Sequence, residues 1–139
     1  RGNTMSNRKT CYSAAAAGLL AVLAVAGAQT AAFARSESGE LRETLAGNTL
    51  YLRTGGIVVP IAYHPDGRMS GRLPPLAAAV AKDMSAKDSG KWWVADGRLC
   101  QRWNQWLEGR SHCYEFTRKG ETVHWVRDDG RKGTARLGS

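Results

Sequence analysis

The sequence lacks an apolar run long enough to cross a membrane as a helix. The longest such run, from Ala14 to Ala28, has fifteen residues, whereas a helix that spans a bilayer needs about 20. A cluster of basic residues that would stop transfer is also missing directly after this run. These two absences argue against a transmembrane anchor in the N-terminal segment.

The same segment has the three parts of a secretory signal peptide. The basic pair Arg8-Lys9 precedes the apolar run, and the small-x-small motif Ala32-Phe33-Ala34 follows it. We therefore expect a signal peptide at residues 5–34, an upstream remnant at residues 1–4, and a periplasmic or secreted mature chain at residues 35–139.

Acidic residues are scarce, with 12 Asp and Glu against 20 Lys and Arg, a net charge of +8. Three of the basic residues precede Arg35, which leaves 17 basic and 12 acidic residues and a net charge of +5 in the mature chain. Outside the cytoplasm this excess favours anionic envelope material as a partner. We expect a monomer that binds an envelope glycan or protein, with no nucleic acid and no membrane span after cleavage.

Cysteine is scarce as well. Of the three cysteines, Cys11 lies in the expected signal peptide, which leaves Cys100 and Cys113. Two cysteines in an oxidising compartment favour one disulfide bond, and bonded sulfurs cannot serve as a thiol nucleophile. A metal site would need further ligands at close spacing, which the three histidines do not supply. We therefore expect a Cys100–Cys113 disulfide, no metal and no cofactor.

Sequence motifs of known catalytic sites are missing. The chain has no Gly-x-Ser-x-Gly, no His-Glu-x-x-His and no glycine loop of the phosphate-binding kind. Each histidine also has a plain structural setting: His64 precedes a proline in a turn, His112 begins a strand, and His124 faces Glu115 across a ribbon. We therefore expect that the protein is not an enzyme and has no catalytic residues.

What the sequence does have is the triplet Asp-Gly-Arg three times, at residues 66–68, 96–98 and 129–131. Asp-Gly between alternating apolar segments is a strong signal for a β-hairpin, because a type I′ turn needs positive φ at both central residues. A calcium site would need a ladder of oxygen ligands before the glycine, which is missing around all three triplets. The triplets therefore predict turns.

The turn at Asp96-Gly97 sorts the neighbouring side chains onto two faces. One face carries Trp92, Val94, Leu99 and Trp103, and the other carries Trp93, Cys100 and Arg102. Pairing Cys100 with Cys113 on the next strand requires a loop at residues 104–109. That loop carries Trp106, and the first face is the expected core.

The same alternation extends through the last two hairpins. A turn at Lys119-Gly120 predicts three opposite pairs, which are Phe116 with Val123, Tyr114 with Trp125, and Glu115 with His124. A three-residue loop, Asp128-Asp129-Gly130, with its glycine left-handed, keeps Ala135 and Leu137 on the apolar face. One parity through five strands is what a meander around a single core requires.

The N-terminal half of the mature chain predicts one short helix followed by strands. Ser38 is expected to cap a helix through residues 40–45 that stops at Gly47. Strands are expected at Thr49–Arg53, Ile57–Tyr63 and residues 68–73. Pro60 indicates that the second of these strands lies at an edge or contains a bulge. Residues 73–90 hold either a short helix after Pro75 or a mobile loop. With about eight strands in all, we expect a single, mainly β domain that forms a small antiparallel barrel or a half-open sandwich.

A series of short motifs runs along nearly the whole mature chain. These are Gly47-Asn48-Thr49, Tyr63 to Gly67, Gly90-Lys91-Trp92, Leu99-Cys100 with Trp103, Cys113-Tyr114 and Asp129-Gly130. The pattern resembles a family of small exported bacterial proteins known only as a domain of unknown function, and the resemblance implies no particular activity. The chain departs from this pattern at residues 73–87, which are longer and richer in alanine.

The aromatic residues outside the expected core are the candidates for binding. Trp93 lies on the outer face near Arg102, and Trp106 lies in a loop with Arg110, so we take these four as candidate binding residues. The function we expect is a non-enzymatic periplasmic β-domain that binds an envelope component. Two alternatives stay open: a small-barrel inhibitor of a secreted protease or lysozyme, and a lipocalin-like carrier of a small apolar ligand. A carrier needs a cavity, and a core filled by the inward aromatic side chains would leave none.

Overall fold

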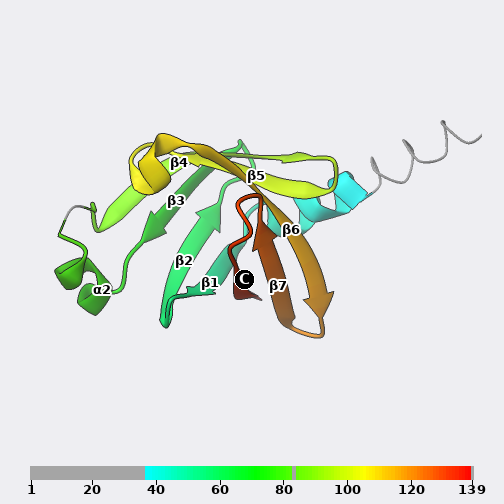
Figure 1. The fold of residues 1–139 in the computed structure, drawn as a ribbon. Coiled ribbons are helices and arrows are strands. Elements are labelled where there is room, and N and C mark those ends of the chain that lie inside the picture. Colours follow the sequence, from blue (N-terminus) through cyan, green and yellow to red (C-terminus); the bar gives the residue numbers. More distant parts are fainter. Residues whose placement is uncertain (1–36, 83, 139) are drawn as a thin grey trace, which may run out of the picture.

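The computed structural model describes residues 37–82 and 84–138 as a closed, eight-stranded antiparallel barrel (Figure 1). Each strand pairs with the next one along the chain, and the last pairs with the first. The strands are β1 (Thr49–Thr54), β2 (Ile57–Tyr63), β3 (Arg68–Arg72), β4 (Lys87–Ala95), β5 (Arg98–Trp103), β6 (Ser111–Lys119), β7 (Thr122–Arg127) and β8 (Lys132–Gly138). The mainly β fold of about eight strands is confirmed, in its barrel form. The expected signal peptide at residues 5–34 and the remnant at residues 1–4 lie outside the described residues.

The Asp-Gly-Arg triplets lie at turns, as predicted. Asp96 and Gly97 both have positive φ, 52° and 69°, and they join β4 to β5 in a two-residue turn. Gly130, with φ of 85°, ends a three-residue loop in which the amide of Arg127 donates to the carbonyl of Arg131 at 2.7 Å. The extra residue of this loop keeps Ala135 on the inner face, where it is buried.

The register of β6 against β7 differs from the predicted one by two residues. Phe116 lies opposite Trp125 and not opposite Val123, and His124 faces Thr117, so the expected Glu115–His124 pair is wrong. Gly120 is the first central residue of the turn, with φ of 62°, instead of the second. Moving a two-residue turn by one position shifts the register by two, which leaves every side chain on its predicted face.

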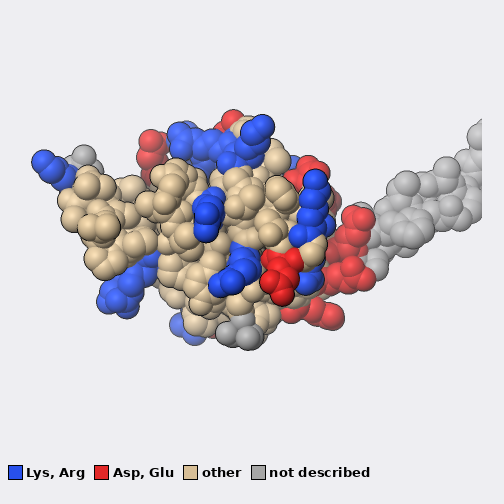
Figure 2. Space-filling model, turned by 90° about the horizontal axis from the view of Figure 1, so that it is seen from below, with Lys and Arg blue, Asp and Glu red and all other residues tan. Residues whose placement is uncertain are grey.

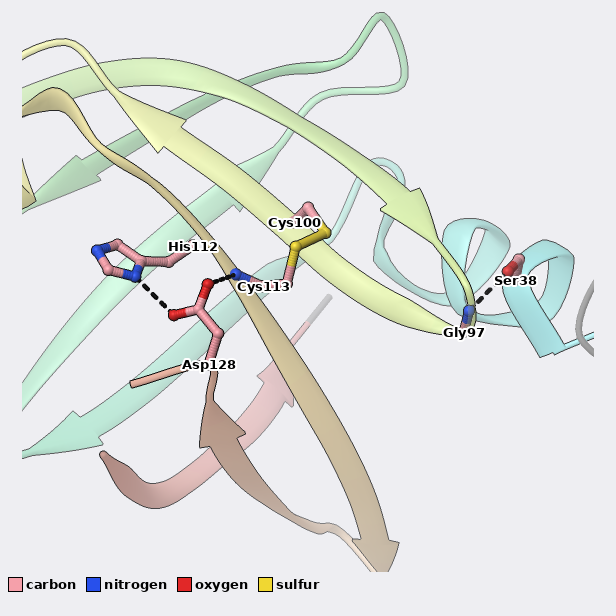
Figure 3. The surroundings of a disulfide bond; sticks show 6 residues. All are labelled: Ser38, Gly97, Cys100, His112, Cys113 and Asp128. Atoms are coloured by element: carbon pink, nitrogen blue, oxygen red, sulfur yellow. Dashed lines mark hydrogen bonds and ion pairs between the residues drawn. A yellow bond between two sulfur atoms is a disulfide. The ribbon is translucent and has the colours of Figure 1, made fainter. Parts of the chain in front are cut away.

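The helix at residues 37–45 closes one end of the barrel, and its Leu45 is buried. Gly47, with φ of 82°, ends it as predicted. The predicted capping role of Ser38 is wrong, because residue 37 is already helical. The Ser38 hydroxyl instead binds the β4–β5 turn. It accepts a hydrogen bond from the amide of Gly97 at 2.8 Å and so holds the helix against the β4–β5 turn (Figure 3).

The inner face of the barrel carries the predicted aromatic side chains. Trp92, Trp103 and Trp125 are all buried, as are Leu99 and Tyr114. Two inward glycines lie where a Cβ would not fit, Gly71 against an indole ring and Gly90 against the backbone of Arg102. A Cβ on Gly71 would lie 2.7 Å from Cζ3 of Trp106, and a Cβ on Gly90 would lie 2.1 Å from a backbone oxygen.

The connection between β3 and β4 contains a short helix, α2 (Pro75–Val80), so the helical alternative for residues 73–90 is the correct one. Pro75 is in the first turn, where its missing N–H costs no hydrogen bond. β3 pairs with β2 only at residues 61–63, which leaves the part of β2 with Pro60 paired on the β1 side. Pro60 therefore lies in an edge-like segment, as predicted.

Candidate functional site

An apolar cavity of about 410 Å³ opens at the end of the barrel opposite the helix at residues 37–45. We call this end the mouth, and it gathers the β1–β2 turn, α2, the β5–β6 loop and the β7–β8 loop. The apolar lining consists of Leu52, Ile57, Val59, Ile61, Leu73, Ala77, Val80, Ala81, Met84, Trp103, Trp106, Leu107 and Trp125. The volume lies within the range of about 300–1,000 Å³ that is usual for small-molecule sites.

Two tryptophans form one wall of the cavity. Trp103 ends β5, and Trp106 begins the 3-10 helix η1 (Trp106–Gly109), with ring centroids 4.7 Å apart. The indole N–H of Trp106 donates to the carbonyl of Ser85 at 2.8 Å. Asp88 Oδ2 also accepts the amides of Gln105 and Trp106, each at 2.8 Å. The wall is therefore held in place by bonds to β4 and to the α2 connection.

The η1 turn contains two residues with left-handed backbone conformations. Leu107 and Glu108 have φ of 53° and 59°, and Leu107 lines the cavity. Such conformations of non-glycine residues cost about 1–3 kcal/mol each and persist where the surrounding structure holds them. Here the side chain of Arg102 donates to the carbonyl of Gly109 at 2.8 Å and closes the loop.

A chain of polar side chains lies inside the barrel and reaches the cavity. Gln101, only 3% exposed, accepts from the hydroxyl of Tyr63 at 3.0 Å and donates to the hydroxyl of Tyr114 at 3.3 Å. Burial raises the pKa of both tyrosines, so both phenols stay protonated at physiological pH. Gln101 and Tyr114 line the cavity and are buried hydrogen-bonding groups of its wall.

Of the residues that line the cavity, only Arg127 and Arg131 are charged, and both lie at the β7–β8 loop. Arg127 is buried and donates through Nε to Asp129 Oδ1 at 2.8 Å. Hydrogen bonding by Arg127 holds the pKa of the Asp129 carboxyl well below its usual range. Arg131 also lines the cavity, with its Nε 4.0 Å from the same carboxylate. The segment from Arg127 to Lys132 contains three cations and two anions, so this side of the mouth has a net charge of +1.

The structure separates the four residues expected to bind a partner. Trp93, which is 37% exposed, and Arg102 lie together on the outer face, where they line a surface pocket. Arg110 is exposed and pairs with Glu108 at 3.0 Å. Trp106 does lie in the β5–β6 loop, but it is only 6% exposed and turns into the mouth.

The polar lining of the cavity was missed by the sequence analysis, although the signal was available. Gln101 falls between Leu99 and Trp103 on the face expected to form the core, and Arg127 falls two residues after the inward Trp125. A polar residue at an inward position of a barrel needs a buried partner or a ligand. That criterion would have selected both residues.

The predicted disulfide is confirmed. Cys100 and Cys113 lie opposite each other on β5 and β6, with Cα atoms 4.0 Å apart (Figure 3). Beside them Asp128 Oδ2 accepts the amide of Cys113 at 3.0 Å, and Asp128 Oδ1 is 2.7 Å from Nδ1 of His112. The His112 hydrogen bond lowers the pKa of Asp128. These bonds attach the β7–β8 loop, and with it Arg127, to the disulfide-linked strands.

Within residues 37–82 and 84–138, no helix is both long and apolar enough to cross a membrane. The same residues contain no group of three or more His, Cys, Asp or Glu side chains that could hold a metal ion. No protein-family model, curated protein or solved structure matches the chain. The resemblance to a family of small exported proteins therefore stays a prediction.

Proposed function

We propose that the chain is a non-enzymatic binding protein that takes the apolar part of a small envelope molecule into the mouth of its barrel. The observation that carries this proposal is the cavity of about 410 Å³, whose walls are almost entirely apolar. Tyr63 and Trp92 pack near the helix at residues 37–45. Trp103, Trp106 and Trp125 line the mouth and leave it hollow. The carrier alternative thus has the cavity that it requires.

The polar groups of the cavity define the chemistry of the proposed ligand. Gln101 and Tyr114 offer hydrogen bonds at depth, and the net positive charge near Arg131 favours an anionic or polar head at the opening. An amphipathic molecule with a short apolar chain and an acidic head fits this arrangement. Export supports the same ligand class, and the disulfide in turn supports export, because such bonds persist in oxidising compartments.

The outer face supports a second candidate function, the binding of an anionic glycan. Trp93, Lys91 and Arg102 line one surface pocket together with Trp103, Asn104 and Ser111, so an exposed indole lies beside two cations. Acidic sugars bind to surfaces of this kind through ring stacking and charge. Binding there would weaken as salt is added and would be unaffected by changes inside the cavity.

The main proposal is tested by filling the cavity. Ala81, the residue that follows α2, is half-buried and lines the cavity, whereas Ala79 on α2 is exposed and lies outside the lining. We expect Ala81→Phe to abolish binding of the apolar dye 1-anilinonaphthalene-8-sulfonate, and Ala79→Phe to bind it like the unmodified chain. Native mass spectrometry of the purified protein then identifies any copurified ligand. Equal dye binding by both variants would reject the cavity as the site.

A further inference from the structure

The surface of α2 and the segment after it carry exposed apolar side chains. Leu76 is 85% exposed and Val80 is 78% exposed, and they lie four residues apart on one face of the helix. Met84, beyond the end of the helix, is 45% exposed. Single exposed apolar residues are common, but three on one projecting element mark an interaction site.

Basic side chains surround this apolar tip. Lys82 follows the helix, and Arg72 lies opposite Lys87 at the base of the connection, all of them exposed. Figure 2 shows Lys and Arg around the projecting lobe at this end of the molecule. We call Arg72, Leu76, Val80, Lys82, Met84 and Lys87 the α2 corner. With Asp83, which lies outside the described residues, the segment from Arg72 to Lys87 has a net charge of +2.

The carboxylates that flank the corner among the described residues are already bonded. Asp88 accepts amides of the β5–β6 loop, and Glu108 forms an ion pair with Arg110. No ion pair between described residues involves Lys82 or Lys87. With the Asp88 carboxylate included, the segment from Arg72 to Asp88 still has a net charge of +1, so the corner is basic towards an outside anion. A basic rim around an apolar tip is the pattern by which peripheral proteins bind anionic lipid surfaces.

The exposed tip is continuous with the cavity. Val80 and Met84 are exposed on the surface and also line the cavity, whose deeper wall is formed by Trp103 and Trp106. An apolar path thus runs from the surface of α2 to the interior of the mouth. Three projecting side chains are too few for the roughly 1,000 Å² that a stable protein interface buries, whereas a lipid surface accepts a small convex tip.

We propose that the α2 corner docks on an anionic lipid surface and brings the mouth of the barrel to the membrane, so that the ligand exchanges between lipid and cavity. Docking itself depends only on the α2 corner. The exchange step rests on the proposed function of the cavity.

The proposal is tested by cosedimentation with vesicles. The closed barrel lies within residues 49–138 and is covered at one end by the described helix at residues 37–45, so the chain from Arg35 is used. We expect it to sediment with vesicles of equal phosphatidylcholine and phosphatidylglycerol, to stay free with phosphatidylcholine alone, and to dissociate in high salt. Equal binding to both kinds of vesicle would overturn the charge argument.

Matched substitutions separate the apolar tip from the rest of the surface. Leu76→Ser with Val80→Ser is expected to lower vesicle binding severalfold, whereas Val126→Ser, an exposed valine on β7 at the opposite side of the barrel, leaves it unchanged. Lys82→Gln with Lys87→Gln is expected to lower binding roughly fivefold for each cation removed. The control pair Arg98→Gln with Lys119→Gln removes the same charge at the turns of the opposite end of the barrel, and it is expected to keep full binding.

Two further measurements distinguish failure of docking from failure of the cavity proposal. Ala81→Phe is expected to lose the dye but to keep vesicle binding, and Leu76→Ser, which lies outside the cavity lining, keeps the dye. Vesicle binding that survives the double serine substitution rejects docking through α2, whatever the dye shows. A wild-type dimer in sedimentation velocity that the same substitution dissociates identifies α2 as a contact between two copies and overturns the proposal.

Discussion

The carboxylate of Asp88, on β4, accepts the backbone amide of Trp106, on η1, at 2.8 Å. The same oxygen accepts the amide of Gln105, so one side chain satisfies two amides of the β5–β6 loop. Trp106 forms the wall of the cavity next to α2. The bond therefore connects the stability of a loop to the shape of the candidate site.

Removing that carboxylate should both destabilise the barrel and open the wall of the cavity. We expect Asp88→Ala to lower the free energy of unfolding by about 1–3 kcal/mol, because partly buried amides lose a charged acceptor. Urea denaturation measures this change, and dye binding should fall with it. Glu43→Ala is the control, because this carboxylate is exposed on the helix at residues 37–45 and accepts no backbone amide among the described residues. Equal losses in the two variants would refute a special role for Asp88.

Gln101 should be intolerant of truncation because it satisfies two buried phenols. We expect Gln101→Ala to cost about 2–4 kcal/mol of unfolding free energy, since it leaves a cavity and unpaired hydroxyls of Tyr63 and Tyr114. Gln101→Ala with Tyr63→Phe and Tyr114→Phe should cost less than the sum of the three single changes, because the unpaired hydroxyls are then gone. Strict additivity in urea denaturation would show that these side chains do not form one network.

Stability should fall in acid through Asp129. The Arg127 hydrogen bond lowers the folded-state pKa of this carboxyl below its unfolded value of about 3.9, so the stabilisation is complete above that pH and is lost as the pH falls towards the folded-state pKa. We expect Asp129→Asn to be less stable near neutral pH and to lose less stability on acidification than the unmodified chain. The measurement is the urea midpoint against pH, with the exposed Glu115→Gln as control. Parallel curves for Asp129→Asn and the unmodified chain would contradict the assignment.

The disulfide should contribute to stability without forming the cavity. It closes a loop between residues 13 apart, for which the loss of unfolded-chain entropy gives about 3 kcal/mol. We expect the double change Cys100→Ala with Cys113→Ala to lower the unfolding free energy by about that amount. Dye binding should persist, because both sulfurs lie on the outer side of the barrel. A folded double variant that has lost the dye would show that the bond also shapes the mouth.

Much of the fold could be predicted because side-chain alternation survives small errors in turns. The turn at Gly120 was placed one residue too early, yet Phe116 and Trp125 remained on the inner face, since the resulting shift was two residues. A glycine fits either central position of a two-residue turn, so the sequence did not distinguish the two registers. The sequence thus predicts which face of the sheet each side chain lies on, but it does not predict which residues lie opposite each other on neighbouring strands.

The cavity was beyond the reach of the sequence for a different reason. Alternation tells that Trp103 points inward, but it does not tell whether an inward indole fills the barrel or lies along its wall. Trp106 was expected in a loop and exposed to partners, and only the bonds to Asp88 and Ser85 turn it inward. Those contacts join segments about 20 residues apart in the sequence. They depend on the connection between β3 and β4, for which the sequence did not decide between a helix and a loop.

Gly71 should be irreplaceable because the tryptophan wall occupies the space of its missing side chain. A Cβ there would lie 2.7 Å from Trp106 and 2.8 Å from Trp103, so Gly71→Ala must displace one of the two rings. We expect a loss of about 1–3 kcal/mol in unfolding free energy, a changed tryptophan fluorescence spectrum and weaker dye binding. Gly39→Ala is the matched control. A Cβ on Gly39, in the helix at residues 37–45, meets nothing within 4 Å, and alanine should stabilise that helix by about 0.5–1 kcal/mol. If Gly71→Ala behaved like Gly39→Ala, the rings would be free to move, and the cavity could not be regarded as preformed.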